Sequence, residues 1–286
     1  MASTPHVQSA SIQTLDSYTF PRHRLRLRQN DPTRTPLVLV ACGSFSPVTF
    51  LHLRMFEMAA DFAKFNTEFE ILGGYLSPVG DAYKKAGLAS ARHRLRMCEL
   101  AVDSGSWVMV DPWEAVHPEY MPTAQVLDHF EHEINEVIGG AERPDGSKVP
   151  VRIALLAGAD LILTMSTPGV WTEADLDHIL GRYGTFIVER TGTDIEDAIS
   201  NLQQYKEKIY VISQLITNDV SSTKIRLFLR REMSVRYLIP APVIEYIEAH
   251  GLYEDDGASS VDGKAKSKGA ETSGRASPAI ANSSKS

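Results

Sequence analysis

The sequence has few cysteines and no long hydrophobic run. Of its 286 residues only two are cysteine, Cys42 and Cys98, and both lie in apolar segments where a small buried hydrophobe is the usual role. So few cysteines exclude a fold that is stabilised by several disulfide bonds, and they are typical of proteins from a reducing compartment. No secretory h-region is evident, and no apolar run reaches the ~18 residues of a membrane span. We therefore expect an intracellular protein with reduced cysteines and no membrane contact.

The sequence also lacks an excess of positive charge and the two common phosphate-binding signatures. Lys and Arg number 29 against 36 Asp and Glu, so the formal net charge is −7 at pH 7, which argues against a protein that coats nucleic acid. Neither GxGxxG nor GxxxxGK[ST] occurs, which excludes the usual dinucleotide fingerprint and the P-loop. Any anionic ligand must therefore be held by local basic clusters of another design.

The chain does contain six short apolar segments separated by stretches with helical periodicity. The first begins at Leu37 and ends in a turn at Gly43, and the others are 70–76, 107–110, 151–157, 185–189 and 209–213. Strands that are apolar at every position are buried on both faces, as in a parallel sheet covered by helices. This alternation predicts an α/β fold: a doubly wound, Rossmann-like parallel sheet of about six strands with helices on both faces, in a single domain.

The composition changes at both ends of the chain. Residues 1–35 are polar, and we expect a mobile extension, with a nuclear-import or docking patch as the alternative. Its arginines occupy alternate positions: Arg22, Arg24, Arg26 and Arg28. The domain proper is predicted to span 36–253 and to contain a flexible loop at 139–150. Residues 254–286 are rich in Ser, Ala, Gly and Lys, a composition that predicts disorder.

The turn after the first strand is GSFSPVTFLH, residues 43–52. A strand, turn and helix in this order place free backbone amides and the positive end of the helix at the carboxyl edge of the sheet, where they favour an anion. His52 lies three residues after Thr49, so the two share the helix face nearest the turn. We therefore expect the imidazole of His52 to donate to a phosphate.

Two further turns are predicted to lie at the same edge. GDAYKK follows the second strand and presents Tyr83 and Lys85 to a ligand, although a solvated lysine pair is the alternative. LLAGAD ends in Gly158 and Asp160, which suits close approach to a ribose or base, with an N-capping aspartate as the alternative. The three histidines at 117, 129 and 132 lack the spacing of a metal site, so we expect no protein metal site.

The segment SSTKIR begins another predicted helix. Ser221 or Ser222 would cap it, and Lys224 and Arg226 would lie in its first turns. Basic residues at a helix start oppose the helix dipole, so a compensating anion is expected there. This helix start and the turn at 43–52 would then form two halves of one phosphate clamp.

Five motifs occur in a fixed order: GSFSPVTFLH, SPVGDAYKK, LLAGAD, NDVSSTKIR and VRYLIP. Over residues 36–253 the chain resembles the eukaryotic nicotinamide mononucleotide adenylyltransferases, whose superfamily signatures (H/T)xxH and (S/T)xxxxR correspond to TFLH and SSTKIR. The resemblance implies transfer of AMP from ATP to nicotinamide mononucleotide, and also to nicotinate mononucleotide, to form NAD or deamido-NAD and pyrophosphate. It further implies Mg²⁺ held mainly by ATP phosphates and water, a homo-oligomer, and a nuclear or cytoplasmic location.

The resemblance also assigns roles to residues of this chain. His52, Lys224 and Arg226 would be catalytic. The residues expected to bind ATP are Gly43, Ser44, Phe45, Thr49, His52, Gly158, Asp160, Asn218, Ser222, Thr223, Lys224 and Arg226. The residues expected to bind the mononucleotide or NAD are Ser44, Phe45, Tyr83, Lys85, Tyr120, Thr123 and Trp171. Tyr120 stands where animal relatives often carry tryptophan, and Ser46 where they often carry asparagine, which affects the expected preference between nicotinamide and nicotinate.

Two other functions fit the motifs less well. One keeps the fold and phosphate chemistry but uses phosphopantetheine or a choline- or glycerol-type phosphate as acceptor. The other is a non-catalytic interaction or chaperone-like protein that retains the fold. The acceptor region around Tyr83 and Tyr120 argues against the first, and the intact His52, Lys224 and Arg226 argue against the second as the sole role.

Overall fold

A computed structural model describes residues 14–105, 107–190 and 195–254. The tail for which the composition predicts disorder lies outside these residues from position 255 onward. Within the described part, no helix is both long enough and apolar enough to cross a membrane.

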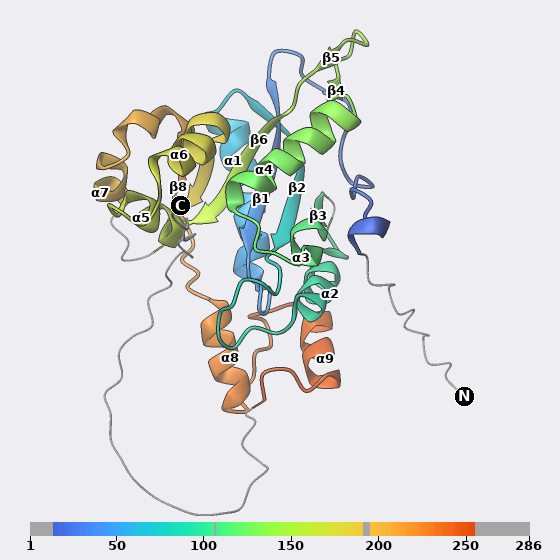
Figure 1. Ribbon diagram of the computed structural model, residues 1–286, viewed down its shortest axis with the longest axis vertical. Coiled ribbons are helices and arrows are strands. Elements are labelled where there is room, and N and C mark those ends of the chain that lie inside the picture. Colours follow the sequence, from blue (N-terminus) through green and yellow to red (C-terminus); the bar gives the residue numbers. More distant parts are fainter. Residues whose placement is uncertain (1–13, 106, 191–194, 255–286) are drawn as a thin grey trace, which may run out of the picture.

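A six-stranded parallel sheet forms the centre of the molecule (Figure 1). Its strands are β1 (Thr35–Gly43), β2 (Phe69–Pro78), β3 (Val108–Val110), β6 (Arg152–Gly158), β7 (Thr185–Val188) and β8 (Ile209–Ile212). Their order across the sheet is β3-β2-β1-β6-β7-β8. The predicted sheet of about six parallel strands is therefore confirmed, and the strand order reverses between β1 and β6.

Helices cover both faces of this sheet (Figure 1). Their bounds are α1 (Phe50–Asn66), α2 (Ala91–Val102), α3 (Trp113–Val116), α4 (Thr123–Glu131), α5 (Ala159–Ser166), α6 (Glu173–Leu176), α7 (Ile195–Ser200), α8 (Ser222–Arg230) and α9 (Ala241–Ala249). Helical turns at His132–Val137 and Asp177–Tyr183 extend α4 and α6, and short 3₁₀ turns lie at Leu15–Ser17 and Gln203–Lys208.

Alternate residues of β1 contribute to two separate cores. Val38 and Val40 pack in one apolar cluster with residues of α4, α5 and α7. Leu37 and Leu39 pack in the other with residues of α1, α2 and α9. Because successive side chains of a strand point to opposite faces, the uninterrupted apolar run of β1 is explained by burial on both sides, as the doubly wound prediction requires.

The segment before β1 differs from the prediction of a mobile extension. Phe20 and Leu25 are buried in the first core cluster. The guanidinium of Arg24 donates to the carbonyl oxygens of Val102, at 2.6 Å, and Val108, at 3.0 Å. The prediction was therefore wrong for this part of residues 1–35, because apolar side chains fill the core while the arginines between them satisfy carbonyls at the margin of the sheet.

The predicted loop at 139–150 contains a small hairpin. Its strands β4 (Ala141–Glu142) and β5 (Lys148–Val149) pair antiparallel, and Arg28 makes an isolated bridge to Glu142. The hairpin stands at the amino edge of the main sheet, far from α8 in Figure 1. The flexibility of this loop stays a prediction.

Candidate active site

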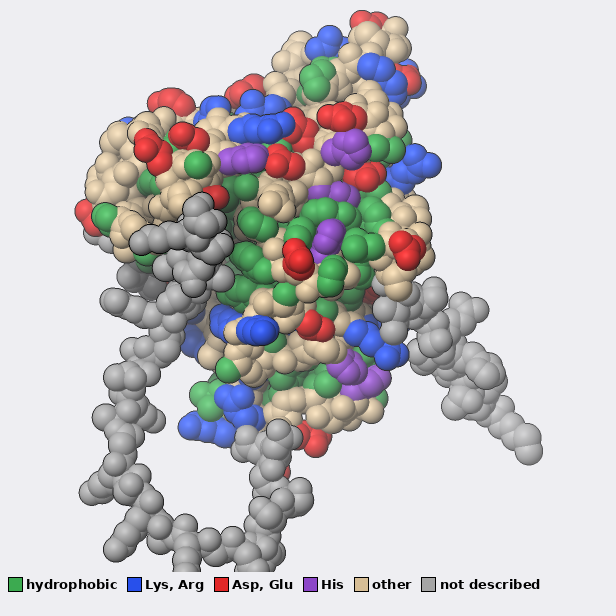
Figure 2. All heavy atoms as spheres, viewed as in Figure 1, with side chains coloured by type: hydrophobic (Ala, Val, Ile, Leu, Met, Phe, Trp, Pro, Cys, Tyr) green, Lys and Arg blue, Asp and Glu red, His purple; other side chains and the backbone are tan. Residues whose placement is uncertain are grey.

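The candidate site lies at the point where the strand order reverses. The carboxyl ends of β1 and β6 are neighbours there, and open α/β sheets bind ligands in such a crevice. The turns after Gly43 and Gly158 border it, as the sequence predicted. On the face shown in Figure 2, Lys and Arg side chains gather over α8 and the loops beside it, with few Asp or Glu side chains among them. The local field there favours an anion although the whole chain is acidic.

The turn after β1 is shaped by the ring of Phe45. Phe45 has a positive φ of 45°, and its buried ring folds back over the end of the strand. A Cβ at Gly43 would lie only 3.0 Å from Cζ of that ring, so any larger residue there would press on the ring of Phe45. On its other side the ring meets the imidazole of His52 edge to face, with centroids 5.2 Å apart. The ring of Phe45 therefore packs against the imidazole of His52 and helps to fix its position.

The first turn of α1 fixes the tautomer of His52. Thr49 caps the helix, and its backbone N–H donates to Nδ1 of His52 at 2.9 Å. A backbone amide can only donate, so Nδ1 is the acceptor and the proton of the neutral ring resides on Nε2. Burial lowers the pKa of His52 to about 4. At neutral pH the residue is therefore an uncharged donor through Nε2, and its contact with a phosphate stays a prediction.

The start of α8 is bonded to the turn after β1. Arg226 is buried, and its Nη1 donates to the carbonyl oxygen of Ser46 at 2.7 Å. The hydroxyl of Ser222 donates to the carbonyl oxygen of Pro47 at 2.8 Å. The two predicted halves of the phosphate clamp are therefore in direct contact. The hydroxyl of Ser222 therefore bonds to the protein turn. The sequence analysis assigned Ser222 to ATP binding alone.

Three other predicted residues near α8 have different surroundings. Lys224 is exposed, and its Nζ donates to the carbonyl oxygen of Asp219 at 3.2 Å. Thr223 is exposed and accepts from Nη2 of Arg226 at 3.4 Å. Asn218 accepts the N–H of Val220 through its side-chain oxygen at 3.0 Å. Lys224 and Thr223 are therefore accessible to a ligand, while Asn218 also shapes the loop.

Sequence reasoning missed Arg94, which supports the same turn. Arg94 is 1% exposed, and its guanidinium donates to the carbonyl oxygens of Ala89, at 2.8 Å, and Ser44, at 3.1 Å. Its signal in the sequence is its position three residues after Ala91 and four before Cys98, on the apolar stripe of α2. A cation at such a position needs acceptors, and here they are these two backbone carbonyls and a carboxylate oxygen of Asp81 at 3.4 Å.

Tyr253 was missed as well. Its hydroxyl lies 2.7 Å from the hydroxyl of Ser46, which also accepts the backbone N–H of Ala89 at 3.0 Å. The end of the domain is thereby connected to the turn after β1. No local pattern indicates this contact, because the two residues are 207 positions apart.

The other predicted side of the site carries aromatic side chains. The rings of Tyr83 and Tyr120 stack with centroids 5.9 Å apart, and Lys85 is exposed two residues after Tyr83. Thr123 is the first residue of α4. Trp171 is half-buried, and its indole N–H donates to the hydroxyl of Thr164 at 3.1 Å. The structure thus pairs the two tyrosines, while it gives no direct contact from them to Thr123 or Trp171.

The turn after β6 has free space beside Gly158. A Cβ at Gly158 would meet no atom within 4 Å, so a ligand can approach the backbone closely. Asp160 is exposed and pairs with Arg190 at 3.1 Å, and Arg190 also lies 3.8 Å from a carboxylate oxygen of Asp219. Arg190, which sequence reasoning missed, therefore connects this turn to the loop before α8.

A buried polar cluster lies behind the tyrosines. Glu114 accepts the hydroxyl of Ser77 at 2.6 Å, and burial raises the pKa of Glu114 to about 8. His129 lies 3.2 Å from a carboxylate oxygen of Asp111 and stacks on Trp113 with centroids 4.2 Å apart. Among the residues that the structure describes, no group of three or more His, Cys, Asp or Glu side chains could hold a metal ion.

Comparisons with known proteins show the family of the chain. The cytidylyltransferase-like family model matches residues 40–228. The nicotinamide/nicotinic acid mononucleotide adenylyltransferase 1 of Saccharomyces cerevisiae is 54% identical over 259 residues, which are 89% of this chain and 65% of the relative. The Schizosaccharomyces pombe enzyme of that name is also 54% identical, over 89% of this chain and 70% of its own length. The Arabidopsis thaliana enzyme is 41% identical over 82% of this chain and 97% of its own length.

A solved structure supports the fold. The Plasmodium falciparum nicotinic acid mononucleotide adenylyltransferase complexed with APC superposes with a TM-score of 0.55 at 20% identity and covers 76% of this chain and 96% of its own. The chain spans 65% of the length of the two Saccharomyces cerevisiae relatives that it matches.

Proposed function

The chain belongs to the nicotinamide/nicotinic acid mononucleotide adenylyltransferases within the cytidylyltransferase-like family, and from that premise we propose that it transfers the adenylyl group of ATP to nicotinamide mononucleotide and nicotinate mononucleotide. The products are NAD or deamido-NAD and pyrophosphate. The observation that carries the proposal is the neutral His52 donor beside a turn held by Arg226. The names of the relatives supply the two acceptors.

The chemistry needs alignment and charge neutralisation. An oxygen of the mononucleotide phosphate attacks the α-phosphorus of ATP, a new P–O bond forms, and the bond to the bridging oxygen breaks as pyrophosphate leaves with the electron pair. A phosphate monoester is largely ionised near pH 7, so no general base is required. Nε2 of His52 donates to a phosphate oxygen at the reacting centre, while Lys224 and Arg226 stabilise the charge that develops on pyrophosphate.

Mg²⁺ is proposed to arrive with ATP. Magnesium prefers oxygen ligands and keeps several of its waters, so one or two carboxylates and substrate phosphates usually hold it. Near the site, the carboxylates of Asp160 and Asp219 are both paired with Arg190. Because these carboxylates already have a cationic partner, we propose that ATP phosphates and water hold most of the ion's coordination positions. When bound, the ion would neutralise charge on the phosphates.

The mononucleotide is proposed to bind on the tyrosine side of the site. Lys85 would contact its phosphate, Tyr83 would lie beside it, and Trp171 would stack on the pyridine ring. Tyr120 and Thr123 would complete the base pocket, while Ser44 and Phe45 would contact both nucleotides. The stacked Tyr83 and Tyr120 support this arrangement, since they offer an aromatic surface beside an exposed lysine.

Two further properties are proposed from the family alone. The protein would act as a homo-oligomer, which sedimentation at several protein concentrations would test. It would work in the nucleus or cytoplasm, without nucleic-acid or membrane partners, which localisation of the full chain and lipid and nucleic-acid binding assays would test.

The decisive experiment is a coupled assay for NAD with the two mononucleotides side by side. ATP- and Mg²⁺-dependent formation of NAD and deamido-NAD, with one pyrophosphate released per product, is the expected result. Phosphopantetheine, choline phosphate and glycerol phosphate serve as alternative acceptors, and pyrophosphate release with one of these alone would contradict the proposal. Calorimetry that detects no binding of ATP or NAD would favour the non-catalytic alternative.

A further inference from the structure

Two segments on the tyrosine side of the site carry residues that the proposed function assigns to the mononucleotide. The first is residues 77–85, here called the acceptor loop, which begins in the last two residues of β2 and carries Tyr83 and Lys85. The second is residues 112–120, here called the α3 segment, which contains α3 and carries Tyr120. The segments follow different strands, so contacts between them must set their relative position.

The acceptor loop packs directly on the α3 segment. A Cβ at Gly80 would lie 3.0 Å from the carbonyl oxygen of Glu114 and 3.3 Å from that of His117, so the two backbones approach closely there. The rings of Tyr83 and Tyr120 stack with centroids 5.9 Å apart. These contacts hold the segments at short range, but neither of them is a hydrogen bond.

One hydrogen bond joins the two segments in the part of the chain that the structure describes. The hydroxyl of Ser77 donates to Oε2 of Glu114 at 2.6 Å. Both residues are buried, with exposed fractions of 0% for Ser77 and 3% for Glu114. Water has little access at this depth, so breaking the bond would leave a buried polar group without its partner.

The backbone that carries Glu114 is itself held in place. A carboxylate oxygen of Asp111 accepts the N–H of Trp113, the first residue of α3, at 3.3 Å. The ring of Trp113 stacks on His129 of α4 with centroids 4.2 Å apart. The side chain of Glu114 therefore extends from a fixed backbone, and its bond to Ser77 transmits that position to the acceptor loop.

The protonation state of Glu114 decides which substitutions test this bond. Burial of a carboxyl group costs free energy, and it raises the pKa of Glu114 to about 8. At pH 7 the carboxyl is therefore mainly protonated, and glutamine reproduces its charge, its length and its acceptor oxygen. Methionine has a similar length but is only a weak acceptor. The two substitutions therefore separate the hydrogen bond from the volume of the side chain.

We propose that Glu114 is a positioning residue for the mononucleotide, because its bond to Ser77 aligns the acceptor loop with the α3 segment. This inference rests on the proposed function, in which Lys85 of the loop contacts the mononucleotide phosphate and Tyr83 lies beside it. Glu114 acts through the loop and not by contact with the substrate. A misplaced loop weakens binding of the mononucleotide, which raises its KM, while other turns hold ATP.

The test measures NAD formation by the full chain at pH 7, with kcat and the KM values for the mononucleotide and for ATP determined separately. Glu114→Met and Ser77→Ala should each raise the KM for the mononucleotide by roughly 5–10-fold. The KM for ATP and kcat should change little, and Glu114→Gln should stay close to the wild type. Because the two damaging substitutions break the same bond, the double variant should show little more than either single variant.

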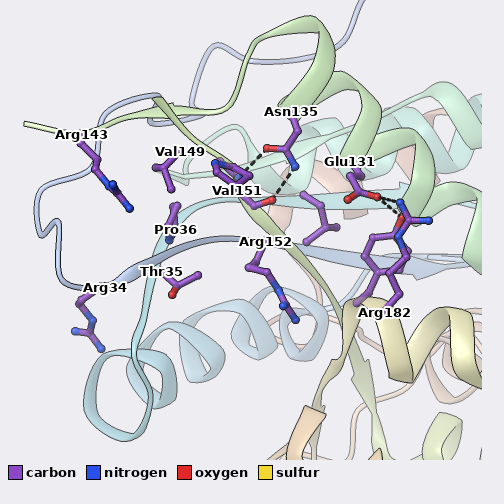
Figure 3. Close-up of a pocket in the computed structure, with 13 residues that line it drawn as sticks. Arg34, Thr35, Pro36, Glu131, Asn135, Arg143, Val149, Val151, Arg152 and Arg182 are labelled. Atoms are coloured by element: carbon purple, nitrogen blue, oxygen red, sulfur yellow. Dashed lines mark hydrogen bonds and ion pairs between the residues drawn. The ribbon is translucent and has the colours of Figure 1, made fainter. Parts of the chain in front are cut away.

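The matched control breaks side-chain bonds at the opposite edge of the sheet. The amide of Asn135 donates to the carbonyl oxygen of Val151 at 2.9 Å and accepts the N–H of Val151 at 2.7 Å (Figure 3). Asn135→Ala should lower the free energy of unfolding in urea without raising the KM for the mononucleotide. A general loss of stability is thereby separated from a misplaced acceptor loop.

Several outcomes would overturn the proposal. These are equal KM values for the mononucleotide in Glu114→Gln and Glu114→Met, additive effects in the double variant, or an equal rise of this KM in Asn135→Ala. Ser77→Ala removes a single oxygen atom, so a normal KM in this variant decides against the proposal even if Glu114→Met does not fold. A wild type that forms no NAD would overturn the proposed function and this inference with it, which distinguishes the two failures.

Discussion

Nη1 of Arg226 lies 2.7 Å from the carbonyl oxygen of Ser46, a residue 180 positions earlier in the chain. This bond joins the start of α8 to the turn after β1, and the Ser222 hydroxyl reinforces it one residue further along that turn, at Pro47. The two motifs therefore form one structural unit before any ligand arrives. A preorganised clamp of this kind needs little rearrangement to bind two anions.

Replacement of Arg226 should affect both catalysis and stability. Arg226→Ala removes a cation from the phosphate clamp, and kcat/KM should fall by ~10²-fold or more. It also leaves the carbonyl oxygen of Ser46 without its partner, so the free energy of unfolding should fall by ~1–3 kcal/mol. Steady-state kinetics and urea unfolding measure the two effects. Near-normal kcat/KM in the folded variant would contradict the assigned role.

His52 should give a pH-dependent contribution to stability. Its pKa is about 4 in the folded protein, against 6.5 in the reference state, so between these values the unfolded chain binds more protons. The contribution of His52 to the free energy of unfolding is therefore fully present above pH 6.5. As the pH falls toward 4, the free energy of unfolding should decrease by on the order of 2–3 kcal/mol.

The matched variant for this prediction is His52→Gln. Glutamine at this helix position can still bond the N–H of Thr49, as in a capping box, but it does not titrate. Urea unfolding between pH 4 and 6.5 should therefore show a shallower pH slope in the variant. Its turnover at neutral pH should fall by ~10²-fold, because the Nε2 donor is lost. An unchanged pH slope would contradict the lowered pKa of His52.

Arg94 is expected to matter through the loops that it holds. Arg94→Met leaves the carbonyl oxygens of Ser44 and Ala89 unpaired, and the free energy of unfolding should fall by ~2–4 kcal/mol. Arg96→Met on the same helix removes only a surface pair with Glu99 and should cost ~0.5 kcal/mol or less. Equal effects of the two substitutions in urea unfolding would show that the loop contacts of Arg94 contribute little.

Glu114 should have the opposite pH dependence to His52. Burial raises its pKa from 4.5 to about 8, so the folded protein binds more protons between these values and stability from this group falls as pH rises through them. Glu114→Gln keeps an acceptor for Ser77 without a charge to bury. In urea unfolding, the free energy of unfolding of the variant relative to that of the wild type should therefore increase by ~3 kcal/mol between pH 5 and pH 8.5. A constant difference over this range would contradict the raised pKa.

Much of the fold and half of the clamp could be predicted because their signals are local. Each strand contains a run of apolar residues, and the spacing of Thr49 and His52 follows from helix geometry. Arg94 and Tyr253 could not be assigned in this way, since their partners are carbonyls and hydroxyls brought close only by the fold. The packed segment around Phe20 was missed because its arginines outnumber the apolar residues that anchor it.

Tyr253 tests whether the end of the domain supports the turn after β1. Tyr253→Phe removes the hydroxyl that lies 2.7 Å from Ser46, and the free energy of unfolding should fall by ~1 kcal/mol. Because Ser46 also accepts from Arg226 through its carbonyl, a looser turn should raise the KM for ATP several-fold with a smaller change in kcat. The control is Tyr246→Phe, which removes a hydroxyl bonded to His93 away from the turn. If both variants change the KM for ATP alike, the effect is a general loss of stability and Tyr253 has no specific role in holding the ATP-binding turn.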